Sequence, residues 1–241
     1  MRDTAGGERK LSIVPTTVTF IDQSTNPKYG GHIFRQAPSL SIGEPWSVIE
    51  SGAGSVVGAS TLSSARFDAV NKDAYPGNWI YLYRPFMRLD TSSLPDTAVV
   101  VSAKIRLKGK YKYDGGVGNV PSMNISEFNP LDKAAIVEGD FQNFGTALFS
   151  TSISYGDWLL EDWNEFPLNE AGLSVISKTG LTVFGTREVA YDLGGATPTW
   201  KKALSTGFAY YGPVRGVEAN MPRLEITYII GAPRSRGFIS D

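Results

Sequence analysis

The residues best suited to chemistry lie in one acidic stretch that also contains two tryptophans. Between residues 157 and 170 the chain has acidic side chains and neither lysine nor arginine. The acids are Asp157, Glu161, Asp162, Glu165 and Glu170. A flat indole stacks on the apolar face of a sugar ring, and carboxylates bind sugar hydroxyl groups. The pattern predicts a glycan site formed by Trp158, Trp163, Asp162 and Glu165.

Two other interpretations of this stretch stay open. The favoured interpretation places the tryptophans in the core and the acids on a solvated loop. Two of the carboxylates could also cleave a glycosidic bond, because glycoside hydrolysis uses a pair of carboxyl groups at a defined separation. Cleavage is the least favoured of the three interpretations.

The remaining candidates for catalysis or metal binding are few. A Ser–His–Asp triad would need His32, the only histidine, but this residue follows Gly30 and Gly31 and is expected in a turn. The absence of cysteine excludes thiol nucleophiles, cysteine-ligated zinc and iron–sulfur clusters. We therefore predict no catalytic residue, no metal site and no cofactor, and leave open only a structural calcium bound by scattered oxygen ligands.

One predicted strand has an unbroken series of cations at alternate positions. They are Lys104, Arg106, Lys108, Lys110 and Lys112. Alternate residues of a straight strand share one face, so these side chains are expected to form a ribbon of positive charge. The ribbon predicts contact with an acidic surface: an anionic glycan, a neighbouring subunit, or the acidic stretch of another copy. The favoured interpretation, however, is a solvated face or an edge strand protected from aggregation by lysine.

Composition limits the classes of partner. The chain has 241 residues, with 23 Lys+Arg against 24 Asp+Glu and a net charge of −1. This balance argues against nucleic acid, which requires a surplus of cations. No apolar run is long enough to cross a membrane, so no membrane insertion is expected. Residues 1–30 lack the apolar core of a secretory signal, so export is not expected if Met1 is the natural start.

The elements that must position these residues are many short strands. Hydrophobic residues make up 41% of the chain, and 26 glycines and 14 prolines supply frequent turns. Period-2 alternation is clear at 103–107 and 223–228. Further strands are predicted at 17–21, 80–89, 123–128, 181–184, 188–191 and 207–211, with one short helix at 198–205. The pattern favours an all-β fold, a two-layer antiparallel β-sandwich.

The two ends of the chain differ from its middle. We predict an N-terminal arm at 1–12, one β-sandwich domain at 13–230 and a C-terminal arm at 231–241. Both arms are polar, but the second contains the apolar pair Phe238 and Ile239. This pair makes the C-terminal arm the better candidate for docking on a neighbouring subunit, although chain ends are often frayed.

Several segments resemble the DNRLRE-type domain family. Residues 86–95 read FMRLDTSSLP, in which Arg88, Asp90, Ser93 and Pro95 match the family signature. The pieces that follow in the family order are SAKIRL at 102–107, WNEFPL at 163–168 and PRLEITY at 222–228. Within the signature we expect Leu89 in the core and Arg88 paired with Asp90 on the opposite side, with Asp90 capping the next turn.

The resemblance implies a jelly-roll-like sandwich related to carbohydrate-binding modules. Such domains occur in cell-surface proteins, beside secreted polysaccharide enzymes and in phage or virus structural proteins. The leading expectation is a non-enzymatic structural, decoration or fibre protein located in a phage or virus particle. Its partners would be other virion proteins, copies of itself and a cell-surface polysaccharide. The alternative is a carbohydrate-binding module of a cell-surface or extracellular protein.

Overall fold

The structure is a computed structural model in which residues 14–22, 31–58, 62–69, 73–114, 116, 118–212 and 218–230 are described. The predicted arms at 1–12 and 231–241, with Phe238 and Ile239, lie outside the described residues and stay predictions. The described residues confirm the all-β fold, with strands that pair antiparallel throughout.

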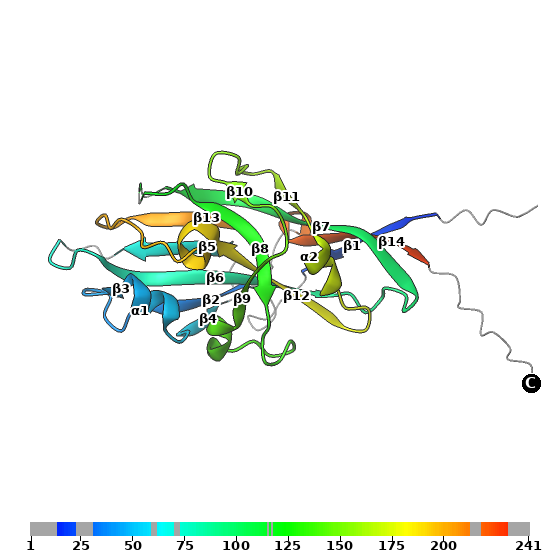
Figure 1. Cartoon of the computed structure of the whole chain (residues 1–241), viewed down its shortest axis with the longest axis horizontal. Helices are drawn as coiled ribbons and strands as arrows, with labels where there is room; N and C mark the ends of the chain where they lie inside the picture. The colour runs from blue at the N-terminus through cyan, green and yellow to red at the C-terminus, as the bar shows by residue number, and fades with distance from the viewer. Residues whose placement is uncertain are drawn as a thin grey trace, which may run out of the picture.

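The smaller of two sheets is centred on the longest strand. Its order is β1 (Thr16–Ile21), β14 (Arg223–Ile230), β7 (Ala98–Tyr113) and β11 (Trp163–Pro167). In Figure 1, β1, β7 and β14 run together to one end of the molecule. Alternate residues of β7 are buried from Ala103 to Leu107, as their period-2 pattern predicts.

The larger sheet continues from the second half of β7. Its main path is β7, β13 (Ser205–Tyr211), β5 (Leu62–Ala69), β6 (Asn78–Asp90), β12 (Leu181–Glu188), β8 (Ser122–Phe128) and β10 (Ile153–Ser154). Attached to this path are β2 (Gly31–Gln36), β3 (Glu44–Pro45), β4 (Val56–Gly58) and β9 (Phe144–Leu148).

Two hydrophobic clusters stabilise the layers. One lies between the sheets, where Ile105 and Ile226 of the smaller sheet belong to the same cluster as Met87. The other packs Phe86 against α1 (Trp46–Ser51) and η1 (Glu138–Asn143). Because Phe86 and Met87 are consecutive on β6, both faces of that strand are buried at this point.

Two sequence predictions of local structure are wrong. No separate strand forms at 188–191: β12 ends at Glu188, and the next residues form a π-helix, η2 (Val189–Leu193). The carboxylate of Glu188 accepts hydrogen bonds from backbone N–H groups of this helix. The helix predicted at 198–205 is irregular chain that leads into β13, and the carbonyl of Leu204 accepts from Ala69 N. At Glu188 a local side-chain cap starts a helical turn, and at Leu204 a hydrogen bond from the distant Ala69 holds the chain extended.

A buried ionic cluster fixes η2 to the larger sheet. Asp192 accepts from Arg84 Nη2 at 2.6 Å and from Arg187 Nε at 2.9 Å. Burial alone would raise the pKa of Asp192, but the two guanidinium groups lower it to about 2. Two short helices, α2 (Glu170–Ser174) and η3 (Glu218–Asn220), complete the described elements.

Candidate functional site

Half-exposed aromatic side chains gather on one face of the larger sheet. The strand register places Phe34, Tyr83, Arg66, Gly207 and Tyr113 in one row across β2, β6, β5, β13 and β7. Cross-strand neighbours share a face, so these side chains point the same way. We call this surface the aromatic face and define it by His32, Phe34, Arg66, Asp68, Tyr81, Tyr83 and Tyr113.

The rings of the aromatic face contact one another. The centroids of Phe34 and Tyr83 are 5.1 Å apart, and those of Tyr81 and Tyr83 are 5.5 Å apart. His32 meets Tyr83 edge-on, at 5.3 Å and 82°. These separations are those of packed aromatic pairs. The rings therefore form one continuous surface. The side chains of Phe34, Tyr81 and Tyr83 are partly exposed to solvent on it.

Arg66 is held between two of these rings. Its Cζ lies 4.8 Å from the centroid of Tyr83 and 5.4 Å from that of Tyr113, within cation–π range. Its Nη2 also pairs with Asp68 Oδ2 at 3.3 Å. Burial raises the pKa of the Asp68 carboxyl, and Arg66 opposes that rise. The ion pair compensates its own charges, so it leaves the aromatic face without net charge.

His32 is a buried member of this face and not the turn histidine that the sequence predicts. It lies in β2 and is 9% exposed. Burial and, second, the positive charge of Arg66 lower its pKa to about 4. The imidazole is therefore neutral at neutral pH, and its Nδ1 has no hydrogen-bond partner among the described residues.

The glycan site predicted from the acidic stretch is wrong in its composition. Trp158 is 2% exposed and packs in the core, with its ring centroid 5.2 Å from that of Phe208. A side chain with both ring faces in the core cannot stack on a sugar. Trp163 is half-buried, and the Cζ atoms of Arg106 and Arg223 already lie 5.0 and 4.9 Å from its ring centroid. Asp162 is exposed and accepts a hydrogen bond from the backbone N–H of Trp163.

The lysine and arginine side chains of the predicted ribbon form ion pairs with glutamates of the same chain. β11 pairs with β7 and sets Glu165 opposite Arg106, so that Glu165 also reaches Lys104 Nζ at 3.0 Å. Glu225 on β14 accepts from Arg106 at 2.7 Å. Further contacts join Lys104 to Glu225, Lys110 to Glu161 and Lys108 to Asn220. The predicted attraction between ribbon and acidic stretch is therefore present, but within one molecule.

Lys112 does not belong to the ribbon, which corrects the prediction of one straight face. The register between β7 and β13 shifts at Ala209/Tyr210, and beyond this bulge Lys112 stands opposite the buried Phe208. Its Nζ donates to the carbonyl of Tyr155 at 3.0 Å. The same bulge turns Tyr113 onto the aromatic face.

The signature residues have structural contacts. Leu89 is 1% exposed, and Asp90 Oδ1 accepts from Ser92 N at 3.0 Å, which confirms the predicted core position and cap. Ser93 is exposed, and the carbonyl of Pro95 accepts from Ala98 N in the following turn. The predicted pairing of Arg88 with Asp90 is wrong: no such ion pair exists in the described part of the chain, and Arg88 Nη1 donates to the carbonyl of Lys133.

Sequence reasoning missed the aromatic face because its members come from distant segments. The alternation of Tyr81 and Tyr83 along the strand was visible, and so was the spacing of Tyr111 and Tyr113. Only strand pairing shows that β6 and β7 present these rings on one surface with Arg66 between them. The available signal was an excess of tyrosine at alternate positions of two predicted strands.

Comparison with known proteins found neither a matching family model nor a matching curated protein. Among the described residues, no group of three or more histidine and carboxylate side chains gathers as a metal site. The helices in the same part of the chain are too short or too polar to cross a membrane. The aromatic face itself contains a single carboxylate, Asp68, so its geometry suits binding by stacking and hydrogen bonding.

Proposed function

We propose that this chain is a non-enzymatic carbohydrate-binding protein and that a glycan lies across the aromatic face. The observation that carries the proposal is the group of half-exposed rings at Phe34, Tyr83 and Tyr81, with Arg66 against the ring of Tyr83. Aromatic faces contact the C–H groups of sugars, while tyrosine hydroxyls and guanidinium donors bind sugar oxygens.

The dimensions and charge of the face indicate the class of glycan. From β2 to β7 the row crosses four strand spacings, roughly 19 Å in total. This span suits an oligosaccharide or polysaccharide chain more than a single sugar. Because Asp68 compensates Arg66, the face suits a neutral glycan.

The test is retention of polysaccharides by the full chain, followed by titration with the best oligosaccharide. Tyr83→Ala should weaken binding by about 30-fold or more, as loss of a central anchor does at about 2 kcal/mol. Trp163→Ala is the matched control on the smaller sheet and should bind like the wild type. The proposal fails if folded Tyr83→Ala retains full affinity, or if the folded wild type binds no glycan.

A second candidate is the structural component of a phage or virus particle that the family resemblance implies. It is favoured by aliphatic side chains of β7 in the smaller sheet, where Val99 and Val101 are 52% and 53% exposed. Exposed apolar groups that lie together mark protein contacts. Here they would be covered by copies of this chain or by other virion proteins.

Light scattering tests this candidate. The full chain should form a defined oligomer that the double variant Val99→Ser, Val101→Ser dissociates while its melting temperature stays close to that of the wild type. A wild-type chain that remains monomeric at high concentration contradicts assembly through these side chains of β7.

A further inference from the structure

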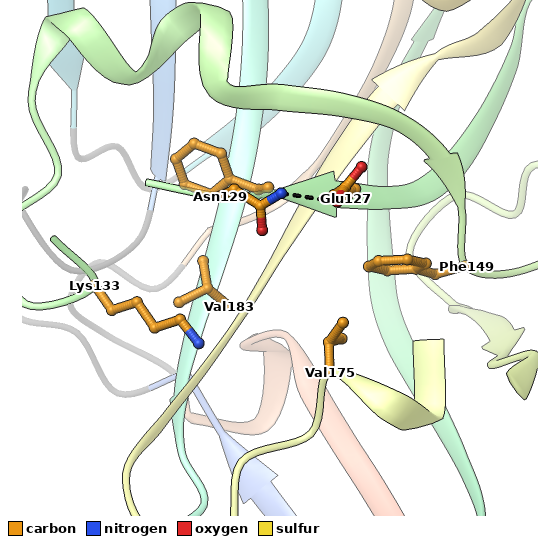
Figure 2. A pocket seen from close by; sticks show the side chains of 7 residues that line it. Glu127, Asn129, Lys133, Phe149, Val175 and Val183 are labelled. Carbon is orange, nitrogen blue, oxygen red and sulfur yellow. Dashed lines mark hydrogen bonds between the residues drawn. The ribbon is translucent and has the colours of Figure 1, made fainter. Parts of the chain in front are cut away.

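A second, smaller site lies apart from the aromatic face and shares no residue with it. A pocket lies beside β8 and β12, and Figure 2 shows the side chains that line it. Its volume is about 180 Å³. Its lining residues are Glu127, Phe128, Asn129, Lys133, Phe149, Val175 and Val183. The apolar members Phe128, Phe149 and Val183 are at most 4% exposed and belong to the hydrophobic clusters. The pocket therefore combines an apolar wall with charged groups.

The charged groups of the pocket are of opposite sign and do not pair with each other. Glu127 Oε1 accepts from Asn129 Nδ2 at 2.7 Å, and this bond orients the carboxylate. Lys133 enters from the side opposite Phe149. Within the described parts of the chain, neither Glu127 nor Lys133 forms an ion pair. A carboxylate acceptor and an ammonium donor are thus both available to a ligand.

The wall that carries Lys133 is held in place by residues outside the pocket. Arg88 Nη1 donates to the carbonyl of Lys133 at 2.7 Å. The carboxylate of Asp140, which is fully buried, accepts from Leu131 N at 2.9 Å and Val137 N at 3.0 Å. A wall held in this way loses little conformational entropy when a ligand binds. This gives the signature residue Arg88 a positioning role.

We infer that this pocket binds a small zwitterion of the amino-acid type with an apolar side chain. The ligand's ammonium group would bind Glu127 and its carboxylate would bind Lys133. Glu127 would repel an anion and Lys133 would repel a cation, whereas a zwitterion can pair with both side chains. The apolar part of the ligand would contact Phe149, Val175 and Val183.

The size of the pocket agrees with this ligand class. A dry cavity of roughly 150 Å³ accommodates benzene. A pocket of about 180 Å³ therefore has room for a side chain of the size of leucine. L-Leucine is the probe that combines this size with both charges.

The experiment is isothermal titration of the full chain with L-leucine and two analogues. L-Leucinamide lacks the carboxylate and N-acetyl-L-leucine lacks the ammonium group, so each should bind about tenfold more weakly or worse. Equal binding of the three compounds overturns the assignment. It is also overturned if folded protein binds no leucine, or if methyl glucoside is the compound that binds at Glu127 and Lys133.

Variants test the roles of Glu127 and Lys133 separately. Glu127→Gln should weaken leucine and leucinamide, whereas Lys133→Met should weaken leucine about tenfold and leave leucinamide unchanged. Arg88→Ala should weaken leucine, and Arg88→Lys should restore part of the affinity because it keeps a donor for the Lys133 carbonyl. Tyr83→Ala is the matched control and should bind leucine like the wild type. Leucine affinity that is insensitive to Lys133→Met overturns the proposal.

Discussion

Two surfaces of this sandwich, the ion-paired face of the smaller sheet and the aromatic face of the larger one, compensate their charges in different ways. On the smaller sheet, Lys104 and Glu165 are 35% and 43% exposed and pair with each other across neighbouring strands. On the aromatic face, Arg66 and Asp68 are 26% and 14% exposed and lie among aromatic rings. The first surface is polar and satisfied by its own chain, whereas the second leaves apolar ring area in contact with water. The row of like charges is thus paired within its own chain, whereas the proposed glycan site is built from half-exposed rings.

One strand contributes to both surfaces, and an irregularity divides them. Up to Gly109, β7 presents cations outward and apolar residues inward. At the register shift against β13, the alternation of the β7 side chains between the two faces of the sheet changes. Lys112 therefore lies on the side of the buried Phe208, and Tyr113 lies on the aromatic face. A single extra residue in the ladder thus separates the ion-paired surface from the aromatic one.

The largest expected effect is on the backbone beneath the aromatic face. Gly207 has φ +132°, and a Cβ there would stand 2.1 Å from the carbonyl oxygen of Ala65. Gly207→Ala should lower the free energy of unfolding by roughly 3 kcal/mol, measured by urea denaturation. Gly77→Ala is the control, because φ is +86° with no atom within 4 Å, and should cost about 1 kcal/mol. Equal losses in the two variants would contradict the close approach at Gly207.

The next effect is a pH dependence specific to the aromatic face. The pKa of His32 is about 4 in the folded protein, whereas the ordinary value for an exposed histidine is 6.5. The unfolded chain therefore takes up the proton first, and the free energy of unfolding should fall as the pH falls from about 6.5 to 4. The His32 contribution to this loss is about 3 kcal/mol.

Urea denaturation across that pH range measures this contribution. His32→Gln retains the other titrating groups and should show a correspondingly shallower decline. Identical pH profiles for wild type and His32→Gln would show that His32 is not buried in its neutral form.

A smaller effect concerns the ion pair among the rings. A double-mutant cycle with Arg66→Met and Asp68→Asn should give a coupling energy of about 1–2 kcal/mol, because the pair is partly desolvated. The measurement is the free energy of unfolding of the four proteins. A coupling near zero would place this pair among ordinary surface ion pairs.

The smallest effect is expected on the ion-paired surface. The matching cycle with Lys104→Met and Glu165→Gln should give a coupling of roughly 0.2–1 kcal/mol. It should decrease further at high salt, which screens exposed charges. A coupling larger than that of Arg66 and Asp68 would reverse the contrast between the two surfaces.

Much of the architecture was predictable from local pattern. The alternation at 103–107 and 223–228 gave the central strands of the smaller sheet and their buried faces. Local pattern could not show the bulge in β7, because a register shift depends on the strand opposite. It also could not show that Trp158 points into the core while Trp163 points outward, since an irregular segment separates them. The aromatic face could not be predicted for the same reason, because its rings come together only when strands that are remote in sequence pair.

The most direct test is a solution NMR titration of tyrosine- and tryptophan-labelled protein with the oligosaccharide that binds most tightly in the retention assay. The account predicts that the ring signals of Tyr81, Tyr83 and Tyr113 shift together as the glycan is added, while the indole signal of Trp163 stays in place. A shift at Trp163 with unchanged signals from those tyrosines would contradict glycan binding at the aromatic face.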